Sequence, residues 1–139
     1  MKQSSFTPTF VETIPEHLEE GQLYISVRFR TASHLCACGC GSRVVTPIKP
    51  PKWKFTYNGE TVSLSPSIGR WQLPCRSHYW IRNNKVIWSR AFTEDEIEAV
   101  IRKDAQALHA YYADDHESPE PEPAVKRNFL SRLWNRITR

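Results

Sequence analysis

The sequence has 139 residues, of which 40% are hydrophobic, with four cysteines, ten prolines and a formal charge of +4. A chain of this length builds one domain with a core but not two full-sized ones, and it has no apolar run near the roughly 18 residues that a membrane span needs. Because the N-terminal residues also lack the apolar stretch of a secretory signal peptide, we expect a cytoplasmic protein without a transmembrane segment. In a reducing compartment, four cysteines indicate metal ligands or reactive thiols rather than disulfides.

The small net charge is the sum of strongly segregated segments. Residues 21–93 contain eleven basic side chains and a single acid, Glu60, whereas residues 94–123 contain ten acids and two basic side chains. Residues 124–139 are basic again, with five Lys or Arg and no acid. This segregation predicts that an acidic helix folds against a basic sheet; the alternative is that the sheet binds an acidic partner.

The first predicted element is a half-buried strand over residues 23–30. Apolar and polar side chains alternate there, and the apolar face runs from Leu23 to Val27 and Phe29. The next residues, 31–52, hold three of the four cysteines and three prolines. Proline has no amide hydrogen to donate to a sheet, so we expect irregular structure in this stretch.

Two β-hairpins are predicted next. Residues 53–57 and 60–64 flank Asn58-Gly59, the strongest short hairpin signal. Residues 79–88 contain two short β-type runs around Asn83-Asn84, and asparagine tolerates the positive φ that a tight hairpin turn requires.

A helix is predicted over residues 93–113. Thr93 and Glu96 form a capping box at its start. Apolar side chains recur at helical spacing and predict one face packed on the sheet; they are Ile97, Val100, Ile101, Leu108 and Tyr111 or Tyr112. Residues 1–113 then form the domain, residues 114–125 an acidic, proline-rich linker, and residues 126–139 a basic amphipathic tail helix that docks on a partner.

All four cysteines and two of the five histidines fall in two short clusters. The first reads His-Leu-Cys-Ala-Cys-Gly-Cys over residues 34–40, and the second reads Cys-Arg-Ser-His over residues 75–78. Tetrahedral Zn²⁺ takes four such ligands, and the set is Cys36, Cys38, Cys40 and Cys75, with His78 as an alternative to one cysteine. Four buried free thiols would be the plain structural alternative, but their clustering speaks against it.

The zinc is predicted to be structural rather than catalytic. Hydrolytic zinc sites keep an open position and an acid that moves protons, and Glu60 is the only acid within residues 21–93. A closed site would tie the strand at 23–30 to the later hairpin. The fold class predicted from these elements is α+β: a small, zinc-stabilised antiparallel β domain with two hairpins and one C-terminal packing helix.

A serine and a histidine are the candidates for chemistry. Ser67 lies in a serine-rich segment, between Pro66 and Ile68-Gly69, where it could occupy the tip of a constrained turn. A hydroxyl nucleophile needs a base within about 3 Å, and the candidate bases are His78 and His34. The plain alternatives are a turn serine and histidines that are ligands or core residues. A Cys75 nucleophile with His78 is less favoured because it would cost the zinc a ligand.

The combination of these motifs resembles a bacterial and phage family. The matching segments are residues 34–41, Thr46-Pro47, residues 63–69, Trp71 and residues 74–81. The family is BubE, formerly a domain of unknown function, encoded beside ubiquitin-like, E1-like and E2-like proteins in bacterial ubiquitination-like (Bub) operons. The resemblance spans about residues 20–90. It implies a deubiquitinase-like serine protease acting on a ubiquitin-like protein, with Ser67 as nucleophile and His78 or His34 as base.

Two functions follow from the sequence. In the first, the chain is a zinc-stabilised serine peptidase that processes or deconjugates a ubiquitin-like protein, with Trp71, Arg76 and Trp80 beside the substrate tail. No acid completes a triad, so we expect a Ser–His dyad, or a histidine oriented by a backbone carbonyl or an asparagine. In the second, the chain is a non-enzymatic zinc module that binds a protein partner or nucleic acid through its basic segment. Nucleic acid is the weaker of these partners, because no reading helix or aromatic RNA-binding motif is visible.

Overall fold

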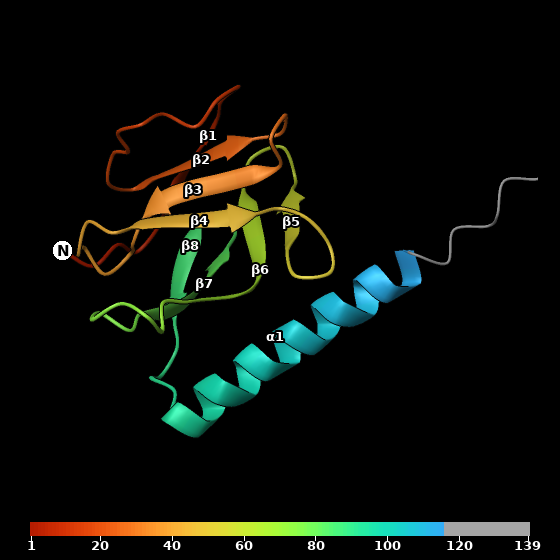
Figure 1. Cartoon of the computed structure of the whole chain (residues 1–139). Coiled ribbons are helices and arrows are strands. Elements are labelled where there is room, and N and C mark those ends of the chain that lie inside the picture. Colours follow the sequence, from red (N-terminus) through yellow and green to blue (C-terminus); the bar gives the residue numbers. More distant parts are fainter. Residues whose placement is uncertain (116–139) are drawn as a thin grey trace, which may run out of the picture.

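A computed structural model describes residues 1–115 of the chain. It contains two four-stranded sheets and one helix (Figure 1). The α+β class with sheets rich in antiparallel pairs is therefore confirmed. The predicted tail helix over 126–139 and all but the start of the predicted linker lie outside the described residues.

The first sheet has the strand order β1-β2-β3-β4, and the second has the order β5-β6-β7-β8. The first consists of β1 (Thr7–Phe10), β2 (Gln22–Ser26), β3 (Thr31–Leu35) and β4 (Arg43–Pro47). The second consists of β5 (Lys54–Tyr57), β6 (Val62–Gly69), β7 (His78–Arg82) and β8 (Lys85–Trp88). All neighbouring strands pair antiparallel except β1 and β2, which run parallel.

The turns of the second sheet follow from local chemistry. β7 and β8 pair from Tyr79↔Trp88 to Arg82↔Lys85, and Asn83 and Asn84 between them both have positive φ. β5 and β6 pair up to Tyr57↔Val62. The loop between them is closed by the Asn58 side chain, which accepts hydrogen bonds from two amides of the loop.

The core forms from apolar side chains of both sheets. Leu23 and Ile25 of β2, and Leu64 and Ile81 of β6 and β7, are all at most 1% exposed. Each such side chain contributes about 1.5–3 kcal/mol to the free energy of unfolding. Packing between the sheets therefore positions the strands that carry the candidate site.

Residues 23–30 do not form one strand, contrary to the sequence prediction. β2 ends at Ser26, whose Oγ donates to the carbonyl of Glu12 and accepts from the amide of Phe29. The chain turns there through Arg30, which has a φ of 48°, and Val27 and Phe29 are 72% and 56% exposed. A local side-chain hydrogen bond thus overrides the alternating pattern.

The prediction of irregular structure over residues 31–52 is also wrong, because β3 and β4 lie there. Pro47 is tolerated because it is the last residue of β4, and β4 is at the edge of its sheet. A proline at an edge leaves no ladder hydrogen bond unmade.

Helix α1 (Glu94–Asp115) begins as predicted but does not pack along the sheet. Ile97 is 7% exposed, whereas Ile101, Leu108 and Tyr112 are 44–52% exposed. The helix runs past the β domain and leaves it (Figure 1). Within residues 1–115, no helix is long and apolar enough to cross a membrane.

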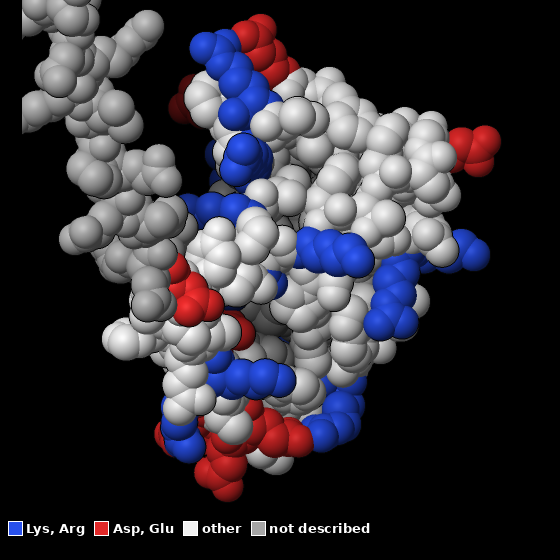
Figure 2. All heavy atoms as spheres, turned by 90° about the vertical axis from the view of Figure 1, so that its right-hand side faces the viewer, with Lys and Arg blue, Asp and Glu red and all other residues white. Residues whose placement is uncertain are grey.

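Ion pairs instead join the helix to the connecting segments of the β region. Three ion pairs connect basic residues of the β region to α1: Lys52–Asp104, Arg76–Glu94 and Arg90–Glu96. Figure 2 shows blue basic side chains over much of this face, and red acidic ones at its lower edge as well as at its top and right. The acidic helix therefore pairs with connecting segments of the basic region, since none of these three basic residues lies on a strand, and the predicted packing of its apolar face on the sheet is not observed.

Candidate active site and cysteine cluster

Ser67 lies on β6 rather than at the tip of a turn. Partner residues on β6 and β7 are Leu64↔Ile81 and then Ile68↔Tyr79, so the register shifts between these pairs. The irregular stretch contains Ser65, Pro66 and Ser67. Such bulges bend a strand and redirect its side chains. Here the bulge leaves Ser67 half-buried, opposite the start of β7.

His78, the first residue of β7, meets Ser67 across this bulge. Its Nε2 is 2.8 Å from Ser67 Oγ, and its Nδ1 is 3.3 Å from the carbonyl oxygen of Arg90. A carbonyl can only accept, so the neutral ring carries its proton on Nδ1. Nε2 is then free to accept the proton of the Ser67 hydroxyl. This is the arrangement of a nucleophile and a general base, oriented by a backbone carbonyl.

Aromatic side chains enclose the His78 ring. Phe92, Trp71 and Trp80 have ring centroids 4.3, 4.9 and 5.3 Å from it, and the residue is 3% exposed. Burial lowers the pKa of His78; the Arg90 carbonyl opposes this shift, and the Arg90 charge adds to it. The ring is therefore neutral at pH 7, as a general base must be.

Gly69 makes room for this aromatic packing. A Cβ added to Gly69 would lie 2.3 Å from two atoms of the Trp71 ring. Trp71 in turn stacks on Phe92, with an interplanar angle of 13°. Only glycine lets the indole approach the backbone beside Ser67 in this way.

His34 is placed elsewhere, in the core. Its Nε2 is 2.9 Å from Tyr79 Oη, and the side chain is fully buried. Burial lowers its pKa to about 3, with the Arg70 charge as a smaller cause. Of the two candidate bases, only His78 has a hydrogen bond to Ser67 within residues 1–115.

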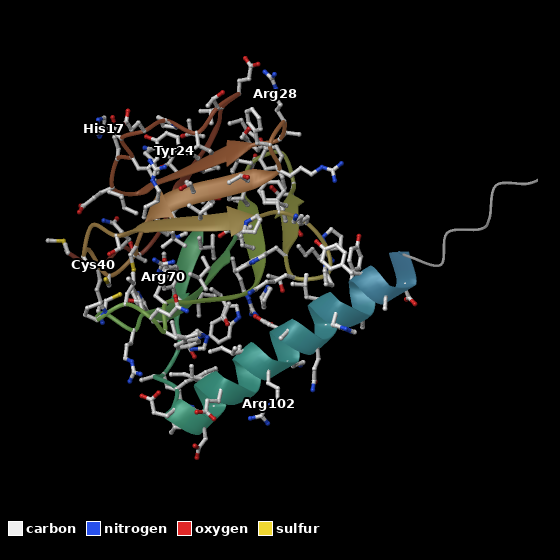
Figure 3. The ribbon with its side chains drawn as sticks, in the orientation of Figure 1. His17, Tyr24, Arg28, Cys40, Arg70 and Arg102 are labelled. Carbon is white, nitrogen blue, oxygen red and sulfur yellow. The ribbon has the colours of Figure 1, made fainter. Side chains whose placement is uncertain are left out.

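The four cysteines converge near the start of β7, and Cys38 and Cys75 line the same hollow as His78. The four sulfur atoms all lie within 4.8 Å of one another, and Cys36 and Cys38 Sγ are 3.5 Å apart. None forms a disulfide. Cys40 lies on the loop between β3 and β4 (Figure 3). Cys75 comes from the segment before β7, so the cluster links the two sheets. His78 is not part of it, which disfavours the predicted variant with a histidine ligand.

The donor set fits a metal ion. Tetrahedral zinc with four thiolates places neighbouring sulfurs about 3.8 Å apart, given Zn–S bonds of about 2.3 Å. Hydrogen bonds from Ser42 lower the pKa of Cys40 to about 6, whereas burial raises that of Cys36 to about 12. A metal ion would deprotonate all four thiols on binding.

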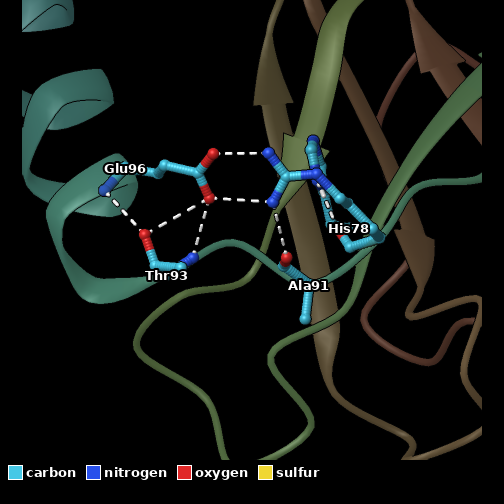
Figure 4. A network of polar contacts seen from close by, with 5 residues as sticks. His78, Ala91, Thr93 and Glu96 are labelled. Atoms are coloured by element: carbon cyan, nitrogen blue, oxygen red, sulfur yellow. Dashed lines mark hydrogen bonds and ion pairs between the residues drawn. The ribbon is translucent and has the colours of Figure 1, made fainter.

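A polar network connects the site to α1 (Figure 4). The guanidinium of Arg90 donates to Glu96 and to the carbonyl of Ala91, while the Arg90 carbonyl faces His78. Glu96 also accepts from the amide of Thr93, and so completes the predicted capping box. The first turn of the helix thereby holds the residue that orients His78.

The predicted substrate-side residues are all close to His78. Trp71 and Trp80 pack on its ring, and Arg76 lines a hollow of about 200 Å³ together with Ser77 and His78. An orienting backbone carbonyl was among the expectations, but neither Arg90 as its source nor Phe92 was predicted from the sequence. A backbone carbonyl has no residue-type signature, and Phe92 precedes the helix without belonging to any motif.

The fold and the site define an α+β protein in which a Ser–His pair lies near a four-cysteine cluster. The family model described as "Bacterial ubiquitination-like system serine protease (BubE)" matches residues 10–89, which cover the pair and all four cysteines. The chain belongs to the BubE family. Comparison with curated proteins and with solved structures gave no match.

Proposed function

We propose that the chain is a serine peptidase that processes or deconjugates the ubiquitin-like protein of a bacterial ubiquitination-like operon. The observation that carries the proposal is the 2.8 Å contact between Ser67 Oγ and His78 Nε2, in a ring whose Nδ1 faces the Arg90 carbonyl. The family match supplies the class of protein. The E1-like and E2-like proteins of the operon are its expected partners, and the cytoplasm is its expected compartment.

The proposed reaction is acyl transfer in two halves. Ser67 Oγ attacks the carbonyl carbon of the scissile bond while His78 Nε2 takes its proton. The same proton then passes to the leaving group, which departs as the C–N or C–O bond breaks. In the second half His78 removes a proton from water, the hydroxide attacks the acyl-enzyme, and Ser67 recovers its hydrogen. The Arg90 carbonyl stabilises the imidazolium that forms in each half.

The cysteine cluster has a structural role in this proposal. Cys36, Cys38, Cys40 and Cys75 would hold Zn²⁺ and join the β3–β4 loop to the segment that leads into His78. An ion with four protein ligands has no open position for a substrate. The alternative of a nucleic-acid module is less favoured, because no reading helix or aromatic RNA-binding motif is visible in the sequence, and three basic side chains of the segment already pair with acids of α1.

The proposal is tested with the ubiquitin-like precursor as substrate. Ser67→Ala is expected to lower the cleavage rate by about 10³-fold or more. The matched control is Ser65→Ala, two residues away on β6 and exposed, which should cleave like the unchanged protein. A fluorophosphonate should label Ser67 and no other serine. Full cleavage by the Ser67→Ala protein would refute the proposal.

A further inference from the structure

The outer edge of β4 and a hollow beside it form a second feature near Ser67. The hollow has a volume of about 210 Å³ and is lined by Val45 and Thr46 of β4 and by Ile68, Gly69 and Arg70. Ile68 and Gly69 are the two residues that follow Ser67 on β6, whereas Ser67 itself does not line the hollow. Arg70 lies between β4 and the segment before β7, as labelled in Figure 3.

Two buried polar groups in this hollow have no hydrogen-bond partner within residues 1–115. They are Thr46 Oγ1, on a side chain that is 1% exposed, and Arg70 Nε. Buried polar groups are nearly always paired in folded proteins, because an unpaired one costs more than it gains. Arg70 Nε donates hydrogen and the Thr46 hydroxyl can donate or accept, so one acceptor oxygen would satisfy both.

The backbone of β4 also has a hydrogen-bond donor and an acceptor at its outer edge. The carbonyl of Ser42 and the amide of Ile48 bond toward β3, whereas the carbonyl of Arg43 accepts from Arg70 on the other side. Because the direction alternates along an antiparallel strand, the amide and carbonyl of Val45 face outward. No strand of residues 1–115 pairs with this edge.

We propose that the outer edge of β4 binds the extended tail of the ubiquitin-like substrate as an added strand, with its main-chain oxygens facing Thr46 and Arg70. Strand addition at a sheet edge is a common mode of peptide recognition, and its affinity comes from main-chain hydrogen bonds. The tail enters along Val45 and reaches Ser67 past Ile68 and Gly69. This inference rests on the proposed function for the identity of the substrate but not for the existence of the binding edge.

The first test leaves the protein intact apart from Ser67→Ala, which prevents turnover. The probe is a fluorescent peptide covering the last ten residues of the ubiquitin-like protein that precede the cleavage point. Binding is measured by anisotropy with peptides methylated on one amide nitrogen at a time. An added strand predicts that affinity falls at alternate positions only, because every second amide faces β4. Equal effects at neighbouring positions, or none anywhere, would overturn the proposal.

The second test uses Thr46→Val, which removes the hydroxyl and keeps the shape. Peptide affinity is expected to fall about five- to tenfold, the equivalent of one hydrogen bond. The melting temperature should stay the same or rise, because an unpaired buried hydroxyl is lost. The matched control is Thr56→Val, an exposed position on β5, which should bind normally. Normal binding by Thr46→Val would remove Thr46 from the site.

The two proposals fail separately in these experiments. If Ser67→Ala still cleaves the precursor but methylation lowers peptide affinity at alternate positions, strand addition at β4 is supported and Ser67 is not the nucleophile. If Ser67→Ala abolishes cleavage but peptide affinity does not fall at alternate positions, the peptidase proposal is supported and strand addition at β4 is refuted.

Discussion

The imidazole of His78 is held at both nitrogens, by Ser67 on one side and by a backbone carbonyl on the other. Because burial lowers its pKa below the ordinary value of 6.5, the ring should stay neutral down to mildly acidic pH. We therefore expect kcat/KM to be constant near pH 7 and to fall only as the pH drops through a midpoint below 6.5. A pH–rate profile of precursor cleavage measures this midpoint.

A variant separates the effect of burial from that of the Arg90 charge. Phe92→Ser opens one wall around His78, so the midpoint of the acid limb should move up toward 6.5. Phe10→Ser is the control, since Phe10 packs on Phe55 and Tyr57 instead. An unchanged midpoint in Phe92→Ser would show that the aromatic wall does not set this pKa.

Gly69 is a second residue whose role can be measured. Gly69→Ala forces the Trp71 ring away from the backbone and is expected to lower kcat/KM about tenfold or more, with a loss of about 1–3 kcal/mol in the free energy of unfolding. The same substitution in a Trp71→Leu background should have much less effect, because the clash is gone. Additive effects in this double-mutant cycle would contradict the explanation.

At the scale of elements, the cysteine cluster joins the β3–β4 loop to the segment before β7. Cys75→Ser is expected to lose the bound metal and to lower the melting temperature by several degrees, because the link between these segments is broken. A chelator should destabilise the unchanged protein in the same way. Native mass spectrometry and thermal unfolding measure both effects. A Cys75→Ser protein that still binds one metal ion per chain would exclude this four-cysteine set.

The start of α1 also acts on the site through Arg90. Glu96→Gln weakens the pair with Arg90 and is expected to lower kcat less than about fivefold, because an exposed ion pair contributes little. Glu98→Gln, an exposed neighbour on the same helix, serves as the control. A loss as large as that of Ser67→Ala would mean that the helix start does more than orient the Arg90 carbonyl.

At the scale of the whole molecule, four of the eleven basic side chains of segment 21–93 pair with acids. The four ion pairs within residues 1–115 all join the basic segment 21–93 to an acidic flank: Arg28–Glu12, Lys52–Asp104, Arg76–Glu94 and Arg90–Glu96. The candidate site lies entirely within residues 1–115. Deletion of residues 118–139 should therefore leave hydrolysis of a small acyl substrate within about twofold, and weaken only complex formation with a partner. Loss of both would place the tail in the catalytic fold.

Several features of the site could be read from short stretches of sequence. Three of the cysteines lie within five residues, so their convergence needed only a tight loop. The capping box of Thr93 and Glu96 and the turn at Asn83-Asn84 are equally local, and the structure contains both. The predicted burial of α1 was wrong, because a periodic apolar stripe does not say whether a surface exists to cover it.

The sequence by itself determined which groups the protein can use: four thiols, a serine and two histidines in a basic β region, followed by an acidic helix. The tertiary structure decided how they combine. It paired Ser67 with His78, placed His34 against Tyr79, and brought the Arg90 carbonyl to His78. The reason is that these contacts depend on the bulge in β6 and on strand register, and a shift of one residue in register turns every side chain to the other face.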